Sequence, residues 1–137
     1  MNKRIRVCWI FKCSLTLVYA YCIYVASTKD TSSTYLPPYV DKLIHFVEFG
    51  LLCLMTCWSL SSARIGTRSI YNIILAVAIT SLYAVSDEFH QSFTPHRSVE
   101  FLDWLADTGG GSIGVAFYWI IARRPWLRAA EGEATVL

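Results

Sequence analysis

Four long apolar segments, separated by short polar stretches, make up most of the chain. They cover residues 7–27, 43–60, 70–86 and 101–122. Each has roughly the 17–25 residues that a helix needs to cross a hydrocarbon core about 30 Å thick. A water-soluble domain can bury one such segment, but four of them in 137 residues leave too little polar sequence for a hydrated surface. The pattern predicts an all-α integral membrane protein, a bundle of four transmembrane helices with short loops.

The polar breaks between the segments agree with these boundaries. Pro37 and Pro38 precede the second segment and cannot continue a helix, because proline lacks the backbone donor and restricts the residue before it. Asp41 then suits the first turn of a helix, where an acid meets the positive end of the helix dipole. Thr94-Pro95 breaks the chain between the third and fourth segments.

The composition fits one membrane domain. Hydrophobic residues make up 55% of the sequence and charged residues 16%. Because a chain of 137 residues holds about one domain, we expect a single domain over residues 1–137. The expected partner is the lipid bilayer, and no nucleic-acid partner is expected.

The first segment has a second interpretation as a secretory signal. It follows the basic start Met1–Arg6 and ends in the small residues Val25-Ala26-Ser27. Its apolar stretch is long for a signal core, however, and Lys12 interrupts it. We therefore expect residues 7–27 to be a retained helix.

The charges predict how the helices are oriented. The basic residues on one presumed side are Lys3, Arg4, Arg6, Lys12, Arg64, Arg68, Arg123, Arg124 and Arg128. The other side holds Lys29, Lys42 and Arg97. It also holds most of the acids, namely Asp30, Asp41, Glu48, Asp87, Glu88, Glu100, Asp103 and Asp107. Because basic residues favour the cytoplasmic side, we expect both termini in the cytoplasm and the acids on the extracytoplasmic side.

The stretch from Asp87 to Gly111 carries most of the unusual chemistry. It contains five acids, two histidines, an arginine and a glutamine between two apolar segments. Ionisable residues are costly at a membrane boundary and are functional candidates for that reason. We therefore expect a functional site at this end of the helices.

Polar residues of the second segment fall on one helical face. Asp41, His45 and Glu48 are spaced i, i+4 and i+7. Glu48 lies about 10 Å along the axis from Asp41, which places it below the membrane interface. The alternative to a functional role is a hydrogen-bonded group that joins two helices.

The third and fourth segments carry similar polar faces. Asp87, Glu88 and Gln91 are neighbours on a helix if the third segment stays helical through them, and the alternative is a solvated helix end. Asp103 and Asp107 are spaced i, i+4 in the first turns of the fourth segment. The helix dipole explains Asp103 well and Asp107 less well.

Two further features suggest how these faces meet. Arg97 is the natural counter-ion for the acids, and its guanidinium can bind a carboxylate or a phosphate in bidentate fashion. Gly110 and Gly114 form a G-x-x-x-G pattern, and small residues at this spacing let membrane helices approach closely. We expect these glycines to pack the fourth helix against the second and third.

The ordered polar residues resemble a known family. The pattern is Asp41-Lys42-x-x-His45-Phe46-x-x-Phe49, then Glu88-x-x-Gln91-x-Phe93-x-Pro95-x-Arg97, then Asp103-x-x-Ala106-Asp107-x-x-Gly110. It resembles the VanZ-like family of small bacterial membrane proteins over residues 41–114. The member that names the family is associated with resistance to teicoplanin, an antibiotic that binds cell-wall precursors. The resemblance implies a multi-pass protein of the bacterial plasma membrane, and members commonly have Asn where this chain has Asp107.

The first functional hypothesis is a binding or accessory role in a cell-envelope or glycopeptide (teicoplanin-type) response. Arg97, Gln91 and Phe93, together with Trp104, would engage a lipid headgroup or a glycopeptide. The remaining candidate binding residues are Asp41, Glu48 and Asp107.

The second hypothesis is a membrane-embedded hydrolase or transferase that acts on a lipid-linked or cell-wall substrate. Glu88 or Asp103 would act as general acid or base, and His45 would relay a proton. Arg97 would hold a phosphate. A divalent metal bound by Asp and Glu oxygens with one His is chemically reasonable, although no established metal motif such as H-E-x-x-H specifies one.

The third hypothesis is a structural subunit of a membrane complex. Lys42 and Arg97 would neutralise the acids and fix the bundle. Buried ion pairs of this kind can be retained for specificity with little net stability.

Overall fold

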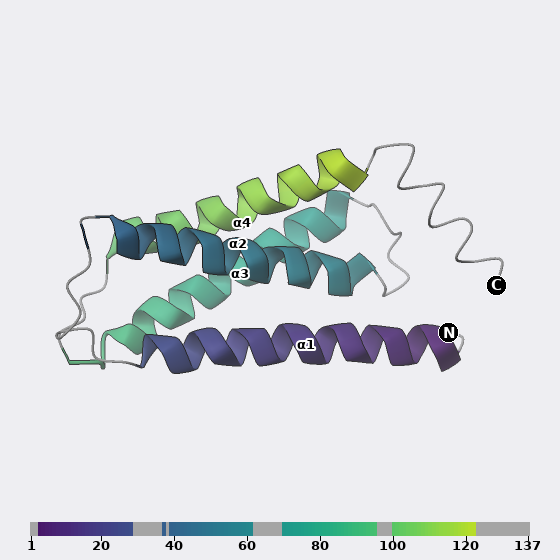
Figure 1. Cartoon of the computed structure of the whole chain (residues 1–137), viewed down its shortest axis with the longest axis horizontal. Helices are drawn as coiled ribbons and strands as arrows, with labels where there is room; N and C mark the ends of the chain where they lie inside the picture. The colour runs from purple at the N-terminus through teal and green to yellow at the C-terminus, as the bar shows by residue number, and fades with distance from the viewer. Residues whose placement is uncertain (1–2, 29–36, 38, 62–69, 96–99, 123–137) are drawn as a thin grey trace.

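The structure is a computed structural model that describes residues 3–28, 37, 39–61, 70–95 and 100–122. Within these residues it has four helices: α1 (Lys3–Ser27), α2 (Val40–Ser61), α3 (Ile70–Gln91) and α4 (Phe101–Ala122). Successive helices run in opposite directions, so the start of α1 and the end of α4 lie at the same end of the bundle (Figure 1). The prediction of an all-α fold is confirmed.

Three of these helices are long and apolar enough to cross a membrane. Among the described residues they are α1 from Arg6 to Ser27, all of α2 and all of α3. The fourth helix also has 22 residues, and its first half carries two acids and a run of three glycines. Length and composition therefore indicate a multi-pass membrane protein.

The packed centre of the molecule lies between α2, α3 and α4. The contact between α2 and α4 is the most extensive, and α3 packs on both. One buried cluster contains Phe49, Leu52 and Ala84, with Ile23 from α1. Around this centre many large apolar side chains face outward, as expected for helices surrounded by lipid, for example Leu82, which is 71% exposed.

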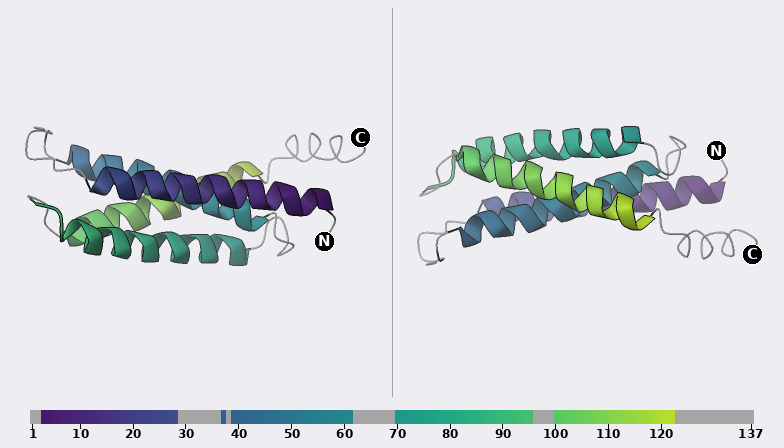
Figure 2. Two further views of the ribbon diagram at one scale, coloured as in Figure 1. Left: turned by 90° about the horizontal axis from the view of Figure 1, so that it is seen from below. Right: turned by 90° about the horizontal axis from the view of Figure 1, so that it is seen from above.

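The first helix lies on the outside of this three-helix unit, against α2 and the edge of α3 (Figure 2). Of its side chains that the structure describes, only Ile23 and Ser27 are buried. Polar contacts attach it: the Thr16 and Ser59 hydroxyls are 2.9 Å apart, and the Tyr83 hydroxyl donates to the Ala20 carbonyl at 2.7 Å. Such interhelical hydrogen bonds are a common way to join membrane helices, because burial of apolar surface drives association little in lipid.

Glycines bring α2 and α4 into backbone contact. A Cβ at Gly110 would collide with the carbonyl oxygen of Phe46 and lie 2.8 Å from its carbonyl carbon. A Cβ at Gly50 would lie 3.2 Å from the Gly110 oxygen, and one at Gly114 would lie 3.3 Å from the Gly50 oxygen. The close approach predicted for Gly110 and Gly114 is confirmed, and its partner on α2 is Gly50.

Three helices are longer than their apolar segments. The first helix begins at Lys3 rather than at residue 7. The second helix begins at Val40 rather than at residue 43, with Asp41 in its first turn as predicted. The third helix continues to Gln91, five residues beyond the predicted end at residue 86. The reason is burial: Asp87, Glu88 and Gln91 are enclosed by neighbouring helices, so the end of the apolar segment is not the end of the helix.

Candidate functional site

The alternation of helix direction brings three polar helix ends together. The starts of α2 and α4 meet the end of α3 at one end of the bundle, on the left in Figure 1. These are the three faces that the sequence marks as polar. The topology therefore makes neighbours of residues far apart in the sequence, such as His45 and Asp107, which are 62 positions apart.

The first helical hydrogen bonds of α2 and α4 begin at the carbonyls of the residues just before each helix. The Tyr39 carbonyl accepts from the Leu43 N–H at 3.1 Å at the start of α2, and the Glu100 carbonyl accepts from the Asp103 N–H at 3.0 Å at the start of α4. Asp41 and Asp103 thus lie in first turns, where the helix dipole stabilises a negative charge.

Lys42 is the cation at the outer edge of the site. Its Nζ lies 3.1 Å from Asp41, 2.8 Å from Glu100 and 2.6 Å from Asp103. The Asp103 side chain is 10% exposed, whereas those of Asp41 and Glu100 are 44% and 46% exposed. Because solvent screens the two exposed pairs, the bond to Asp103 is the one that contributes most.

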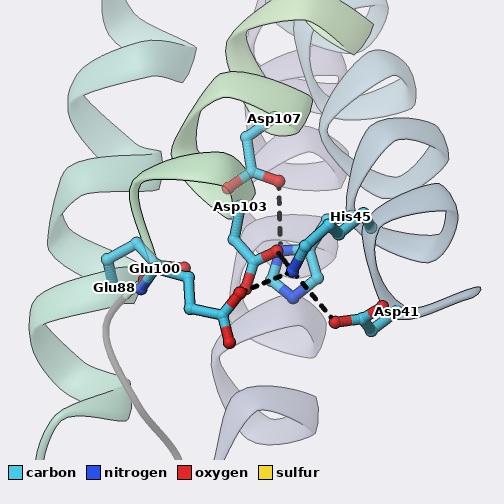
Figure 3. Close-up of polar contacts among 7 residues, drawn as sticks. Asp41, His45, Glu88, Glu100, Asp103 and Asp107 are labelled. Carbon is cyan, nitrogen blue, oxygen red and sulfur yellow. Dashed lines mark hydrogen bonds and ion pairs between the residues drawn. The ribbon is translucent and has the colours of Figure 1, made fainter. Parts of the chain in front are cut away.

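Deeper in the bundle, His45 and Asp107 form a buried pair across the α2–α4 contact. Their Nδ1 and Oδ1 atoms are 3.0 Å apart, and Asp107 is completely buried (Figure 3). Phe49, one helical turn further along α2, lies parallel to the imidazole with ring centroids 6.2 Å apart. The imidazole is therefore held in place on one side by an aromatic ring and at one nitrogen by a carboxylate.

Glu88 completes this inner group from α3. Its Oε2 accepts a hydrogen bond from the Glu100 backbone N–H at 3.0 Å, which ties the end of α3 to the start of α4. Its other oxygen, Oε1, is buried without a hydrogen-bond partner, as is Oδ2 of Asp107. His45, Glu88 and Asp107 each present a ligand atom, and these atoms all lie within 4.8 Å of one another. We call these three residues the inner triad.

Of the predicted site residues, the structure brings together five. They are Asp41, His45, Glu88, Asp103 and Asp107. Within this set the grouping differs from the sequence-based assignment. Asp103 pairs with Lys42 at the outer edge, and Asp107 rather than Asp103 accompanies His45 and Glu88.

The other predicted site residues lie apart from the inner triad. Gln91 is buried and donates to Asp87 at 2.7 Å, so it serves the helix end. Phe93 is 71% exposed and meets Phe89 edge-on. Glu48 is half-buried, and its backbone carbonyl accepts from the Tyr19 hydroxyl at 3.3 Å. Arg97 lies outside the described residues.

Sequence reasoning gave Glu100 no role. The structure makes it the cap of α4, a partner of Lys42 and the donor to Glu88. A signal was present, because an acid three residues before Asp103 at the start of an apolar segment fits a helix N-terminus. No local sequence pattern indicates the hydrogen bond from Glu100 to Glu88, because this bond joins two different helices.

Comparison with known proteins places the chain in a family. A family model described as VanZ/LLP1 matches residues 4–122. The chain belongs to the VanZ/LLP1 family. No curated protein and no solved structure matches it. The match covers all four helices, so the inner triad and its surroundings lie within the VanZ/LLP1 region of the chain.

The charge of this VanZ/LLP1 site is strongly negative. Six acids lie at this end of the bundle: Asp41, Asp87, Glu88, Asp103 and Asp107 on the three helices, and Glu100 immediately before α4. Among the described residues, the basic side chain paired with them there is Lys42, and its ion pairs go to the outer acids. Chemically, the inner triad can exchange protons or bind a cation.

Proposed function

We propose that this protein is a membrane-embedded hydrolase or transferase that acts on the headgroup of a lipid-linked cell-envelope substrate. The observation that carries the proposal is the inner triad, a histidine and two carboxylates from three different helices, buried together in an apolar bundle. Groups of this type, held close together and away from water, are those that catalyse proton transfer.

Each member of the inner triad has a distinct role in this proposal. Glu88 is the general acid and base: it takes a proton from the attacking water or hydroxyl and returns one to the leaving oxygen. His45 relays that proton. Asp107 orients the imidazole through the 3.0 Å contact to Nδ1, as a carboxylate does in other histidine-dependent enzymes.

The geometry favours catalysis over simple binding. Two residues expected to engage a ligand have other contacts, because Gln91 is hydrogen-bonded to Asp87 and Phe93 packs on Phe89. The side chains that converge are instead the ionisable ones. A role in a glycopeptide (teicoplanin-type) response is a separate prediction that the phenotype described below addresses.

The ion-pair geometry also argues against a purely structural role for the whole cluster. Lys42 neutralises acids at the outer edge, which suits a structural function. None of its ion pairs reaches Glu88 or Asp107, although both are buried. Among the described residues, Asp107 has only the imidazole of His45 as a partner, and Glu88 has no ion pair. A cluster selected only for stability would give both carboxylates a cation, since an uncompensated buried charge is costly.

The surroundings support a substrate that arrives through the bilayer. Leu43, Phe89 and Phe101 are exposed apolar residues at the same end of α2, α3 and α4, where lipid chains would contact them. Asp107 lies about 10 Å along the axis from the start of α4, at 1.5 Å per residue. The distribution of basic residues supports an extracytoplasmic position for this end of a four-span bundle, with both termini in the cytoplasm.

A complementation experiment tests this function. A deletion strain is screened against cell-wall antibiotics, teicoplanin included, and its membrane lipids are profiled by mass spectrometry. We expect Glu88→Gln and His45→Gln to leave the deletion phenotype uncorrected and the same lipid-linked species accumulated, at wild-type protein levels. A binding protein would give a phenotype without a change in lipid turnover.

Ser81→Ala is the matched control. Ser81 lies half-buried on α3 and contacts the Thr108 hydroxyl at 3.0 Å, so the change removes an interhelical polar contact outside the inner triad. It should complement fully. Full complementation by Glu88→Gln would contradict the proposed function.

A further inference from the structure

We propose that the inner triad binds one divalent transition-metal ion, Zn²⁺ or Mn²⁺, with His45, Glu88 and Asp107 as its ligands. The metal site itself stands on geometry and charge. The role of the ion as a Lewis acid for a phosphate-bearing lipid rests on the proposed function. With the ion bound, His45 and Glu88 would be its ligands, and the ion would activate the attacking water in place of proton transfer by these two side chains.

The positions of the ligand atoms suit one ion. All three lie within 4.8 Å of one another, and bonds of about 2.1 Å would place opposite ligands about 4 Å apart. The separation of 3.0 Å between His45 Nδ1 and Asp107 Oδ1 is that expected for two adjacent ligands on such an ion. A pair of ligand atoms wider than about 4 Å would have to close by side-chain rotation when the ion binds.

The unpartnered oxygens point to a missing cation. Glu88 is 5% exposed and Asp107 is 0% exposed, yet Oε1 of the first and Oδ2 of the second have no hydrogen-bond partner. Buried polar atoms are almost always satisfied by protein, water or an ion, because leaving them bare is costly. An ion bound to Glu88 Oε1 and to both oxygens of the Asp107 carboxylate would satisfy the two unpartnered atoms together.

Charge leads to the same conclusion. Lys42 forms its ion pairs with Asp41, Glu100 and Asp103, so the two inner carboxylates gain no basic partner from it. Two carboxylates in an apolar bundle repel each other strongly at low dielectric constant. One divalent cation balances their charge.

The ligand types select the kind of metal. Ca²⁺ takes six to eight oxygen ligands, and Mg²⁺ retains several waters and seldom binds to protein side chains alone. One imidazole nitrogen and two carboxylate oxygens suit Zn²⁺ or Mn²⁺ better. Three protein ligands also leave positions for water or a substrate oxygen, which is the arrangement of catalytic rather than structural metal sites.

The open positions suggest the substrate class. A divalent ion with free positions binds phosphate oxygens well and neutralises charge on them. The remaining acids at this end would repel an anionic headgroup if no cation were present. We therefore infer that the substrate is a lipid-linked phosphate or pyrophosphate, drawn to the site by the metal.

The packing around the inner triad would hold the ligands in place. The Glu100 backbone N–H donates to Glu88 Oε2 at 3.0 Å and leaves Oε1 for the ion. The glycine contact between Gly110 and the Phe46 carbonyl sets the spacing of the two helices that carry His45 and Asp107. Such outer contacts orient metal ligands and tune their affinity.

The experiment measures metal binding by the full chain in lipid nanodiscs. After treatment with EDTA and its removal, the protein is titrated with MnCl₂ alone, with free Mn²⁺ followed by electron paramagnetic resonance, and with ZnCl₂ alone by calorimetry. We expect saturable binding of one ion per chain. Asp107→Asn and Glu88→Gln should each weaken binding at least tenfold, and Mg²⁺ and Ca²⁺ should compete poorly.

Asp87→Asn is the matched control. Asp87 is a buried acid next to Glu88 in sequence, but it pairs with Gln91 and lies outside the inner triad. Its change should leave the affinity within about twofold of the wild type. Equal weakening by Asp87→Asn and Asp107→Asn would indicate diffuse attraction by acids and overturn the site, as would the absence of saturable binding by the wild type.

A second, spectroscopic readout tests the nitrogen ligand without measuring an affinity. Co²⁺ bound to the wild type should give visible absorption bands, which change when His45→Gln removes the nitrogen ligand. Unchanged bands would overturn the assignment of His45 as a ligand. The two proposals can fail separately. If the wild type binds metal but Glu88→Gln complements fully, the metal site is supported and the proposed function is refuted. If Glu88→Gln fails to complement but the wild type binds no metal, the proposed function is supported and the metal site is refuted.

Discussion

Among the described residues, Lys42 is the lysine that pairs with acids at the acidic end of the bundle. Its ammonium group forms ion pairs with Asp41, Glu100 and Asp103, and its side chain is 18% exposed. The pair with Asp103 is the least exposed of the three. Because a charged hydrogen bond in such a position is worth more than an exposed one, the cost of losing Lys42 depends chiefly on Asp103.

We predict that Lys42→Met lowers the free energy of unfolding by about 1.5–3 kcal/mol, because Asp103 is left as an uncompensated, nearly buried charge. The measurement is reversible unfolding in mixed micelles. Asp41→Asn removes a partner that is 44% exposed and should cost less than about 1 kcal/mol. An equal loss of unfolding free energy in the two variants would show that burial does not decide how much each ion pair contributes.

Among the helices, the α2–α4 contact decides where the inner triad forms. Gly110 and Gly50 let the two backbones meet, and this places His45 of α2 beside Asp107 of α4. The neighbouring glycines are not equivalent. A Cβ at Gly109 meets no atom within 4 Å, whereas one at Gly110 meets the Phe46 backbone.

We therefore predict that Gly110→Ala destabilises the protein by about 1–3 kcal/mol, because the added methyl group meets backbone that has no rotamer to change. Gly109→Ala should be neutral or stabilising by up to about 1 kcal/mol, since alanine favours the helix. Thermal unfolding of both variants in detergent is the measurement. A Gly109→Ala variant as unstable as Gly110→Ala would contradict the glycine contact described above.

At the scale of the whole molecule, the number of helices that cross the membrane fixes the side on which the acidic end lies. Among the described helices, α1, α2 and α3 meet the length and hydropathy expected of a span, and α4 carries two acids within its first two turns. The position of α4 inside the bundle, packed on α2 and α3, argues that it crosses with them. Basic residues at both chain ends then predict cytoplasmic termini.

Reporter fusions test this orientation. Alkaline phosphatase fused after residue 94 should be active, because that point would lie outside the cytoplasm. Fusions after residues 61 and 137 should be inactive, and green fluorescent protein at the same points should give the opposite result. Active phosphatase after both residue 94 and residue 137 would show that α4 does not cross.

Much of the fold could be predicted from local pattern. The apolar segments, the prolines before α2 and the first-turn acids Asp41 and Asp103 locate four helices within a few residues. The end of α3 could not be located in this way. Asp87, Glu88 and Gln91 are polar, and only their burial against other helices explains why the helix continues through them.

The sequence indicated most of the residues of the candidate site but not which of them contact one another. Helical spacing places His45, Glu88, Asp103 and Asp107 on polar helix faces. It does not determine which of these residues contact one another, because that depends on how far each helix extends along its neighbours. The sequence by itself determined an apolar helical chain with acids concentrated at one end, because hydropathy and charge are local properties. The tertiary structure decided that Lys42 binds the outer acids and that His45 meets Glu88 and Asp107. Those contacts depend on the close approach of α2 and α4 at Gly110, which is a relation between helices.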